Sequence, residues 1–470
     1  MKRLNQFLLI LSMLFSLQVT ASDLNDIAIF YRCYSQITQK FPDPQLSQIA
    51  AVKAGKDPIT ACLEIFDSAS FANKTHTLKA ANVNDDNAKA VLKTMHTLHF
   101  SWFAMQFYPE IASQYLTNVN NILDSSSPAS FLTKSLFDNA SPMSDIVSGT
   151  VSYRPIRVFE NVPNAPYNGT AIADYIFTNV KFASVGNLLG FEILPVDDTL
   201  DYSFDENQTP PESIITGTLT YNKHFGGGLM GHQTYLIQNI KSNTFNPTPD
   251  GGVKTMRNWS RSVFNDLLCR ALPAVRESDG ASFVDLQSSI TFRNSQSCVK
   301  CHTSMDQMAG VVRGAVYSAK VGKFFNPGHS AFIEERTPTQ PSADIFPTAP
   351  DPAFRNRPPE GRLYYRTHNG TLVDQAVSNL QDLGTKIAAQ DDMYNCMAKR
   401  YYQFFTGIDG DIGDIADPHH GTLSSEELVV RGIILNLGQQ LKTHQNSRVL
   451  IETILRRPEY KKSNFNVGGF

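Results

Sequence analysis

The sequence feature that most constrains this chain is the run Cys-Val-Lys-Cys-His at residues 298–302. Cys-x-x-Cys-His is the pattern that attaches c-type haem, through two cysteine thioethers and a histidine that binds the iron. One helical turn places both sulfurs on one side of the porphyrin and the next imidazole under the iron. With 6 Cys and 11 His in 470 residues, chance produces such a match in roughly 0.002 of shuffled sequences. The motif therefore predicts one covalent haem c, attached at Cys298 and Cys301, with His302 as the proximal iron ligand.

Two other uses of this cysteine pair are poorly supported by its surroundings. A zinc site needs a fourth ligand and usually a second paired motif, which the sequence does not supply. A thioredoxin-type redox pair needs a preceding strand, whereas residues 293–297 are polar. A plain structural disulfide between Cys298 and Cys301 remains the main alternative to haem.

The N-terminal residues match a secretory signal peptide. Lys2 and Arg3 form a basic start, residues 7–17 are almost entirely apolar, and small residues precede a cleavage site near Ala21. The apolar run is too short to cross a bilayer. Its removal changes the formal net charge from −3 to about −5, which does not favour nucleic-acid binding. We expect a bacterial Sec-type leader and a periplasmic or secreted mature chain, with no nucleic-acid partner and no transmembrane segment.

The cysteines outside the haem motif are even in number, as expected in an oxidising compartment. Cys33, Cys62, Cys269 and Cys396 allow three pairings. Cys33 and Cys62 lie in two amphipathic segments of one N-terminal unit, which favours a bridge between them and leaves Cys269 to pair with Cys396. Free buried thiols are the alternative.

The apolar pattern predicts a mainly α fold with few short strands. Helical spacing recurs at residues 23–114, 258–272, 391–407, 424–437 and 447–457, and a capping box from Ser424 to Glu427 opens the fourth of these segments. We therefore expect a signal peptide at 1–21, a helical N-terminal domain at 22–124, an irregular, loop-rich domain at 125–255, a cytochrome c-like helical haem-binding region at 256–336, a Pro-rich linker at 337–360 and a helical C-terminal domain at 361–470.

The motif does not identify the sixth iron ligand. Met397 is a candidate because a Cys269–Cys396 bridge would hold its helix near the haem region. The alternatives are ordinary core packing of Met397 and an open sixth position. Other side chains that could reach the iron are Met393, His329 and His368, the last of which fits a polar turn.

Further polar candidates are weaker. Arg293 and Arg313 lie on either side of the motif and could pair with haem propionates, although solvated surface arginines are an equal alternative. His96 and His99 share a helix face beside aromatic residues, which favours core packing over metal binding. No catalytic residue is identified from the sequence.

Several segments together resemble planctomycete-type multi-domain cytochrome c-like proteins. The likeness is carried by residues 174–179, 228–236, 265–269, 298–306 and 396–407. The family usually continues after the motif aspartate with Pro-Leu-Gly, whereas here residues 307–310 read Gln-Met-Ala-Gly. The resemblance implies an extracytoplasmic, mainly helical c-type haem protein whose domains are of unknown function.

Three functions follow as hypotheses. The first is an extracytoplasmic monohaem c-type cytochrome-like protein that transfers single electrons to or from an unidentified redox protein or small molecule. The second is a haem-containing oxidoreductase whose substrate site is built from residues 125–255, since long irregular segments often carry binding loops. The third is a haem-free binding or structural protein stapled by disulfides.

Overall fold

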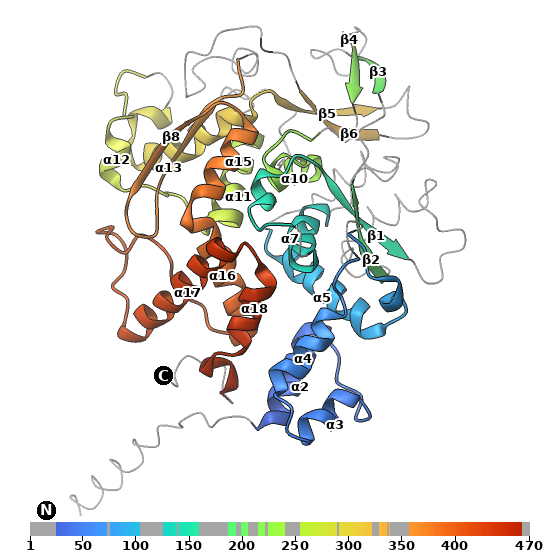
Figure 1. Cartoon of the computed structure of the whole chain (residues 1–470). Helices are drawn as coiled ribbons and strands as arrows, with labels where there is room; N and C mark the ends of the chain where they lie inside the picture. Colours follow the sequence, from blue (N-terminus) through green and yellow to red (C-terminus); the bar gives the residue numbers. More distant parts are fainter. Residues whose placement is uncertain are drawn as a thin grey trace, which may run out of the picture.

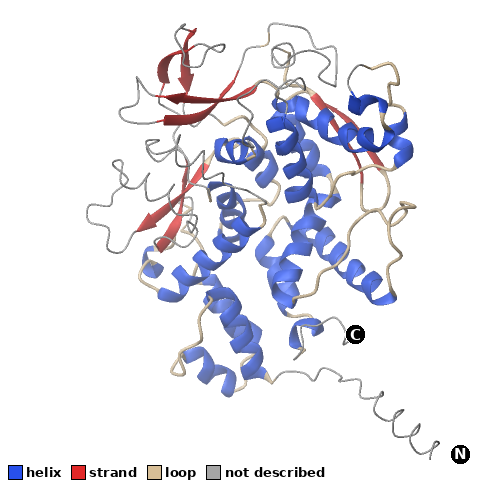
Figure 2. Cartoon of the chain, turned by 180° about the vertical axis from the view of Figure 1, so that it is seen from behind, coloured by secondary structure: helices blue, strands red, loops and turns tan. Residues whose placement is uncertain are grey.

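The computed structural model shows a mainly α-helical protein with short strand pairs around a helical body (Figures 1 and 2). The residues that it describes are 25–72, 76–103, 126–138, 141–158, 187–193, 199–204, 215–220, 224–239, 254–288, 291–321, 329–335, 338 and 357–462. The predicted signal peptide, the family-like segment at 174–179 and most of the predicted Pro-rich linker lie outside them. Within these ranges, no helix is long and apolar enough to cross a membrane.

The helices follow the predicted pattern closely, and the mainly α prediction is confirmed. The α-helices are α2 (Asp26–Thr38), α3 (Ser47–Lys53), α4 (Pro58–Asp67), α5 (Asp86–Ser101), α7 (Ser127–Phe137), α8 (Asp145–Ser148), α10 (Gln233–Gln238), α11 (Lys254–Leu268), α12 (Glu277–Ala281), α13 (Gln296–Ala309), α15 (Leu380–Ala389), α16 (Asp391–Thr406), α17 (Ser425–His444) and α18 (Ser447–Leu455). Short 3-10 helices are η1 (Ala80–Asn82), η3 (Gly228–Gly231), η4 (Thr291–Asn294), η5 (Gly310–Val312) and η6 (Pro458–Lys461).

The strands form antiparallel pairs rather than one large sheet. They are β1 (Tyr153–Val158) with β2 (Asn187–Ile193), β3 (Thr199–Phe204) with β4 (Ile215–Thr220), β5 (Ala315–Val321) with β6 (His329–Glu335), and β7 (Gly361–Arg366) with β8 (Leu372–Val377). Isolated two-stranded pairs are marginal in water, so they need helices to pack against. The β7–β8 pair meets this need by lying on α13.

The N-terminal helices form one packed unit. Asn25 and Asp57 accept backbone N–H bonds at the starts of α2 and α4 and so satisfy donors that the helices leave unpaired. Cys33 of α2 and Cys62 of α4 are bridged, with their Cα atoms 6.2 Å apart. This pairing confirms the prediction made from the two amphipathic segments.

The C-terminal helices are set by local signals and a second bridge. Ser424 and Glu427 form the predicted capping box of α17, and Gly407 ends α16 with a left-handed φ of 75°. The predicted bridge between Cys269 and Cys396 is present, with Cα atoms 5.2 Å apart. It ties α16 to the segment that follows α11.

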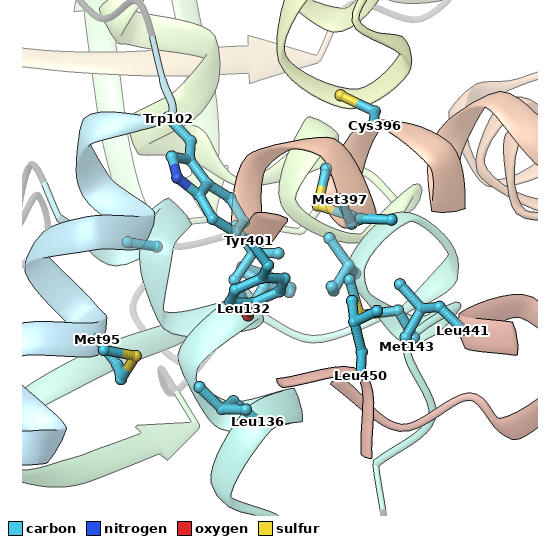
Figure 3. Close-up of a cluster of buried hydrophobic side chains, with 14 of the residues drawn as sticks. Met95, Trp102, Leu132, Leu136, Met143, Cys396, Met397, Tyr401, Leu441 and Leu450 are labelled. Atoms are coloured by element: carbon cyan, nitrogen blue, oxygen red, sulfur yellow. The ribbon is translucent and has the colours of Figure 1, made fainter. Parts of the chain in front are cut away.

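One apolar core runs through the described parts of the chain, from Ile29 in α2 to Tyr460 in η6. Figure 3 shows part of it, where Leu132 of α7, Met397 of α16 and Leu450 of α18 come together. All three side chains are almost completely buried, and each such burial contributes roughly 1.5–3 kcal/mol. The segments predicted at 22–124, 125–255 and 361–470 thus share a core.

Candidate functional site

The Cys-x-x-Cys-His motif lies in the first half of α13, as the spacing predicts. Cys298 is exposed, while Cys301 and His302 are partly buried. Both cysteines are free thiols, although the other four cysteines of the chain are bridged. Burial raises the pKa of the Cys301 thiol, so this sulfur is protonated at neutral pH. The motif therefore offers two reduced sulfurs and one imidazole on a single helix.

His302 is oriented by a carboxylate one helical turn further along α13. Its Nδ1 lies 3.0 Å from Oδ2 of Asp306, and the His302 side chain is 19% exposed. A neutral imidazole that donates from Nδ1 keeps its lone pair on Nε2. The contact therefore leaves Nε2 as the nitrogen of His302 that can bind a metal.

Asp306 is in turn held by Arg257 of α11. Nε and Nη2 of Arg257 donate to the two carboxylate oxygens at 2.7 and 2.9 Å. The Asp306 side chain is fully buried, and burial alone would raise the pKa of its carboxyl. The hydrogen bond from His302 and the charge and hydrogen bond of Arg257 outweigh burial and lower this pKa. Asp306 is thus an ionised carboxylate in the protein interior.

An aromatic ring completes the support of His302. Phe292, just before α13, stacks on the imidazole with ring centroids 4.0 Å apart and planes inclined by 16°. The guanidinium of Arg257 lies 5.0 Å from the centre of the Phe292 ring. The histidine plane is therefore fixed by stacking and by a hydrogen bond at the same time.

The neighbours of α13 approach it closely through glycines. A Cβ atom at Gly361, the first residue of β7, would collide with the carbonyl oxygen of Gln307. Gly280 of α12 is less crowded, since a Cβ atom there would lie 3.2 Å from Cα of Lys300. At Gly361 only a residue without a side chain lets β7 pack so near the helix. The motif helix is thus held from several sides by α11, α12 and β7.

The two arginines proposed as propionate partners have different positions. Arg313 is buried, and its Nε and Nη2 donate to the carbonyl oxygens of Gly310 and Glu360 at 3.0 and 2.9 Å. It joins the end of α13 to the start of β7. Arg293 lies in η4 next to Phe292 and is partly buried, close in sequence to the motif helix.

The candidates for a distal ligand are spread over other elements. Met397 is fully buried in the apolar core of Figure 3, on a helix that packs mainly against α17, α11 and α18. Met393 is also fully buried in α16. No extensive contact joins α16, which carries both methionines, to α13 in the described part of the chain. His329 begins β6, and its side chain lies outside the description.

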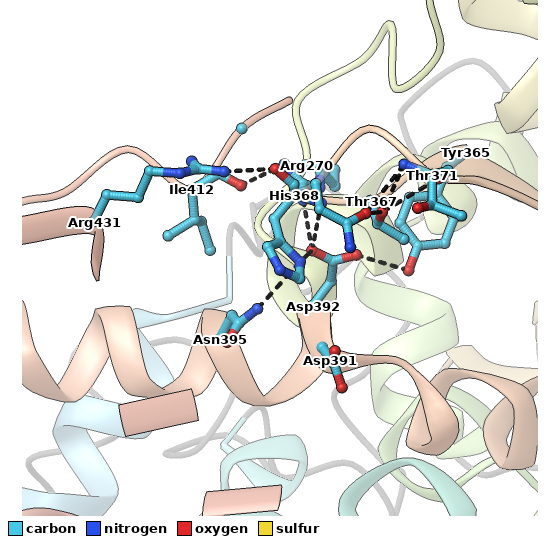
Figure 4. Close-up of polar contacts among 12 residues, drawn as sticks. Arg270, Tyr365, Thr367, His368, Thr371, Asp391, Asp392, Asn395, Ile412 and Arg431 are labelled. Atoms are coloured by element: carbon cyan, nitrogen blue, oxygen red, sulfur yellow. Dashed lines mark hydrogen bonds and ion pairs between the residues drawn. The ribbon is translucent and has the colours of Figure 1, made fainter. Parts of the chain in front are cut away.

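His368 belongs to a second buried contact, which the sequence did not reveal (Figure 4). It lies in the turn between β7 and β8, as predicted, and its Nδ1 is 3.1 Å from Oδ1 of Asp392. Arg270 donates to the same carboxylate at 2.5 Å and Tyr365 at 3.1 Å. Burial would raise the pKa of Asp392, but His368 and Arg270 lower it. The network anchors the start of α16 to the β7–β8 hairpin.

A small cavity of about 250 Å³ lies in the region predicted to be irregular. Lys134 of α7, Asp145 of α8 and Tyr153 of β1 are among its lining residues. Lys134 Nζ lies 3.4 Å from Asp138, and burial with nearby carboxylates raises the pKa of Tyr153 to about 12. The cavity lining is therefore partly polar and includes a phenol that keeps its proton.

The support of His302 could be predicted only in part. Asp306 follows His302 by four residues, a spacing that brings side chains together on a helix. No local signal marks Arg257 or Phe292 as their partners. In the described part of the chain, no group of three or more His, Cys, Asp or Glu residues could hold a metal ion. His96 and His99 are buried in the core, where His99 contacts Thr133 and Tyr401 at 2.8 and 2.7 Å.

Comparisons with known proteins add no relative. No protein-family model matches the chain, and neither the curated proteins nor the solved structures include a significant match.

Proposed function

We propose that this chain is an extracytoplasmic, monohaem c-type cytochrome-like protein that transfers single electrons. The observation that carries the proposal is the arrangement on α13, where two unbridged cysteines precede a histidine whose Nδ1 already contacts a buried carboxylate. Haem c, when bound, supplies an iron that gains and loses one electron.

The residues of α13 have separate roles in this proposal. The thiols of Cys298 and Cys301 would hold haem covalently, each through a thioether bond to one of its vinyl groups. Asp306 keeps the His302 proton on Nδ1, so that the Nε2 lone pair would be available to bind the iron. Phe292 stacks on the imidazole of His302 and would hold its plane for iron binding. Arg257 compensates the charge of Asp306.

The setting of the protein is part of the same proposal. The signal-peptide pattern at residues 1–21 supports a mature chain in the periplasm or outside the cell. Two disulfides are compatible with such an oxidising compartment. The electron partner is a redox protein or a small donor or acceptor. The proposed resemblance to planctomycete-type cytochrome c-like proteins rests on the order of motifs alone.

The test is expression with a bacterial haem-attachment system, followed by an absorption spectrum and an intact mass of the denatured protein. We expect one haem per chain that survives denaturation, and its loss in a Cys298→Ser/Cys301→Ser variant. His419→Gln is the matched control, because the His419 side chain is 72% exposed and lies on another segment. Wild-type protein without covalent haem and with a Cys298–Cys301 disulfide contradicts the proposal and supports the haem-free alternative.

The cavity lined by Lys134, Asp145 and Tyr153 favours a second candidate function, a haem-containing oxidoreductase. It lies within residues 125–255, where the substrate site of such an enzyme was expected. Its elements α7, α8 and β1 have no extensive contact with α13 among the described residues, so electrons would pass between separate sites. Carbon monoxide and cyanide titrations separate the two functions. An iron that binds neither ligand supports a carrier, and an accessible iron supports the oxidoreductase.

A further inference from the structure

The acceptor of the His302 Nδ1 proton is an anion rather than a neutral group. Metal-bound histidines donate their second ring N–H to a carboxylate, a backbone carbonyl or a water molecule. Here the acceptor is Oδ2 of Asp306, at 3.0 Å. A charge-assisted hydrogen bond of this kind is stronger than one to a neutral carbonyl. The choice of acceptor therefore bears on how strongly His302 donates its other lone pair.

The carboxylate is built into the fold and is screened from water. Asp306 is 1% exposed, and Arg257 holds both of its oxygens from α11. Phe292 covers a face of the imidazole and also contacts the guanidinium of Arg257. Interactions between charges are stronger in such a low-dielectric setting than at a surface. The effect of Asp306 on His302 is thus weakly screened by solvent.

From this geometry we propose that Asp306 is a positioning residue that sets the reduction potential of the haem. It draws the Nδ1 proton toward its oxygen and makes Nε2 a stronger electron donor to the iron. A stronger donor stabilises the ferric state more than the ferrous state, since the ferric iron carries the extra positive charge. The potential is therefore lower than with a neutral acceptor, and the reduced protein is a ready electron donor. This inference rests on the proposed haem attachment.

Arg257 reduces the effect of Asp306 on the reduction potential without removing it. Its positive charge nearly cancels the field of Asp306 at a distance. The hydrogen bond between Asp306 and His302 acts through direct contact and remains. Two variants separate these contributions. Asp306→Asn keeps the size of the side chain and can accept a hydrogen bond, but it removes the charge. The double variant Asp306→Asn/Arg257→Met removes the positive charge of Arg257 as well, so that the pair again has no net charge.

The experiment is a potentiometric titration of haem-loaded wild type and both variants, with His419→Gln as control. We expect Asp306→Asn to raise the midpoint potential by at least about 59 mV, a tenfold change for one electron. The double variant should also lie above wild type. A double variant at the wild-type potential shows that the rise in Asp306→Asn came from the unpaired charge of Arg257 and not from loss of the hydrogen bond to His302, and it overturns the inference. A midpoint potential equal to that of wild type in both variants also overturns the inference.

A second measurement does not require haem or a variant that folds. A ¹⁵N–¹H correlation spectrum of the haem-free wild type should show His302 with its proton on Nδ1, shifted downfield by the carboxylate, and a bare Nε2. A neutral His302 with its proton on Nε2 instead of Nδ1 contradicts the inference. If no haem attaches to wild type, the proposed function fails, whatever this spectrum shows. If haem attaches and the potentials do not move, only the role of Asp306 fails.

Discussion

His224 is expected to make the free energy of unfolding depend on pH between 6.5 and about 4. Backbone groups occupy both of its ring nitrogens. The N–H of Gly226 donates to Nδ1 at 3.0 Å, and Nε2 lies 2.8 Å from the carbonyl oxygen of Gly228. Only a neutral imidazole can accept at one nitrogen and donate at the other. These contacts hold a turn of three consecutive glycines with left-handed φ angles of 85°, 69° and 57°.

The size and sign of the effect follow from the pKa. Burial lowers the pKa of His224 from 6.5 to about 4, against a smaller opposite effect of the Gly228 carbonyl. The unfolded chain therefore binds a proton at a higher pH than the folded chain. Stability is fully present above pH 6.5 and falls as the pH drops toward 4. A shift of this size corresponds to a loss on the order of 3 kcal/mol at pH 4, out of a total of about 5–15 kcal/mol.

Urea unfolding of wild type and His224→Asn at pH 7, 6, 5 and about 4 tests this prediction. At pH 7 the variant should be less stable by about 1 kcal/mol, the usual cost of a lost hydrogen bond. At pH 4 it should be the more stable protein, because it has no proton to take up at this position. Comparison with the variant cancels other titrating groups, such as buried His99, whose pKa is also lowered by burial. A wild-type advantage that stays constant across the pH range refutes the reasoning.

Two further predictions concern long-range links. Removing the Cys269–Cys396 bridge, which closes a separation of 127 residues, should cost about 5 kcal/mol in urea unfolding. The N-terminal bridge spans only 29 residues, and its removal should cost about 1 kcal/mol less; the reverse order contradicts the chain-entropy argument. Asp392→Asn leaves the buried guanidinium of Arg270 without its anion and should destabilise the protein by about 3–5 kcal/mol. The control Asp374→Asn breaks a partly exposed pair and should cost at most about 1 kcal/mol, and equal losses in both variants would show that burial is not the cause.

The elements that sequence reasoning predicted well are those encoded by near neighbours. The capping box at Ser424 and Glu427 and the left-handed Gly407 mark ends of α17 and α16 as expected. The helical turn that carries Cys298, Cys301 and His302 is likewise present in α13. In each case the deciding contacts join residues within about four positions of one another, so the pattern is visible in the chain itself.

The disulfides could be predicted from the sequence only in part. The even number of cysteines outside the motif limited the pairings to three, and the amphipathic segments around Cys33 and Cys62 selected the pairing that is observed. The geometry of the second bridge depends on how α16 packs beside α11, which no local pattern describes. The number of cysteines limited the possible disulfide pairings, and the packing of the helices brought one set of pairs together.

The sequence by itself determined which residues are candidates for haem attachment, whereas the tertiary structure decided how His302 is held. Arg257 lies 49 positions before Asp306 and reaches it only because α11 packs on α13. Met397 shows the same limit, since its helical stripe allowed a ligand or a core residue, and packing places it in the core. Contacts between distant segments depend on the shape of the whole interior. The buried carboxylate behind His302 is therefore a property of the fold.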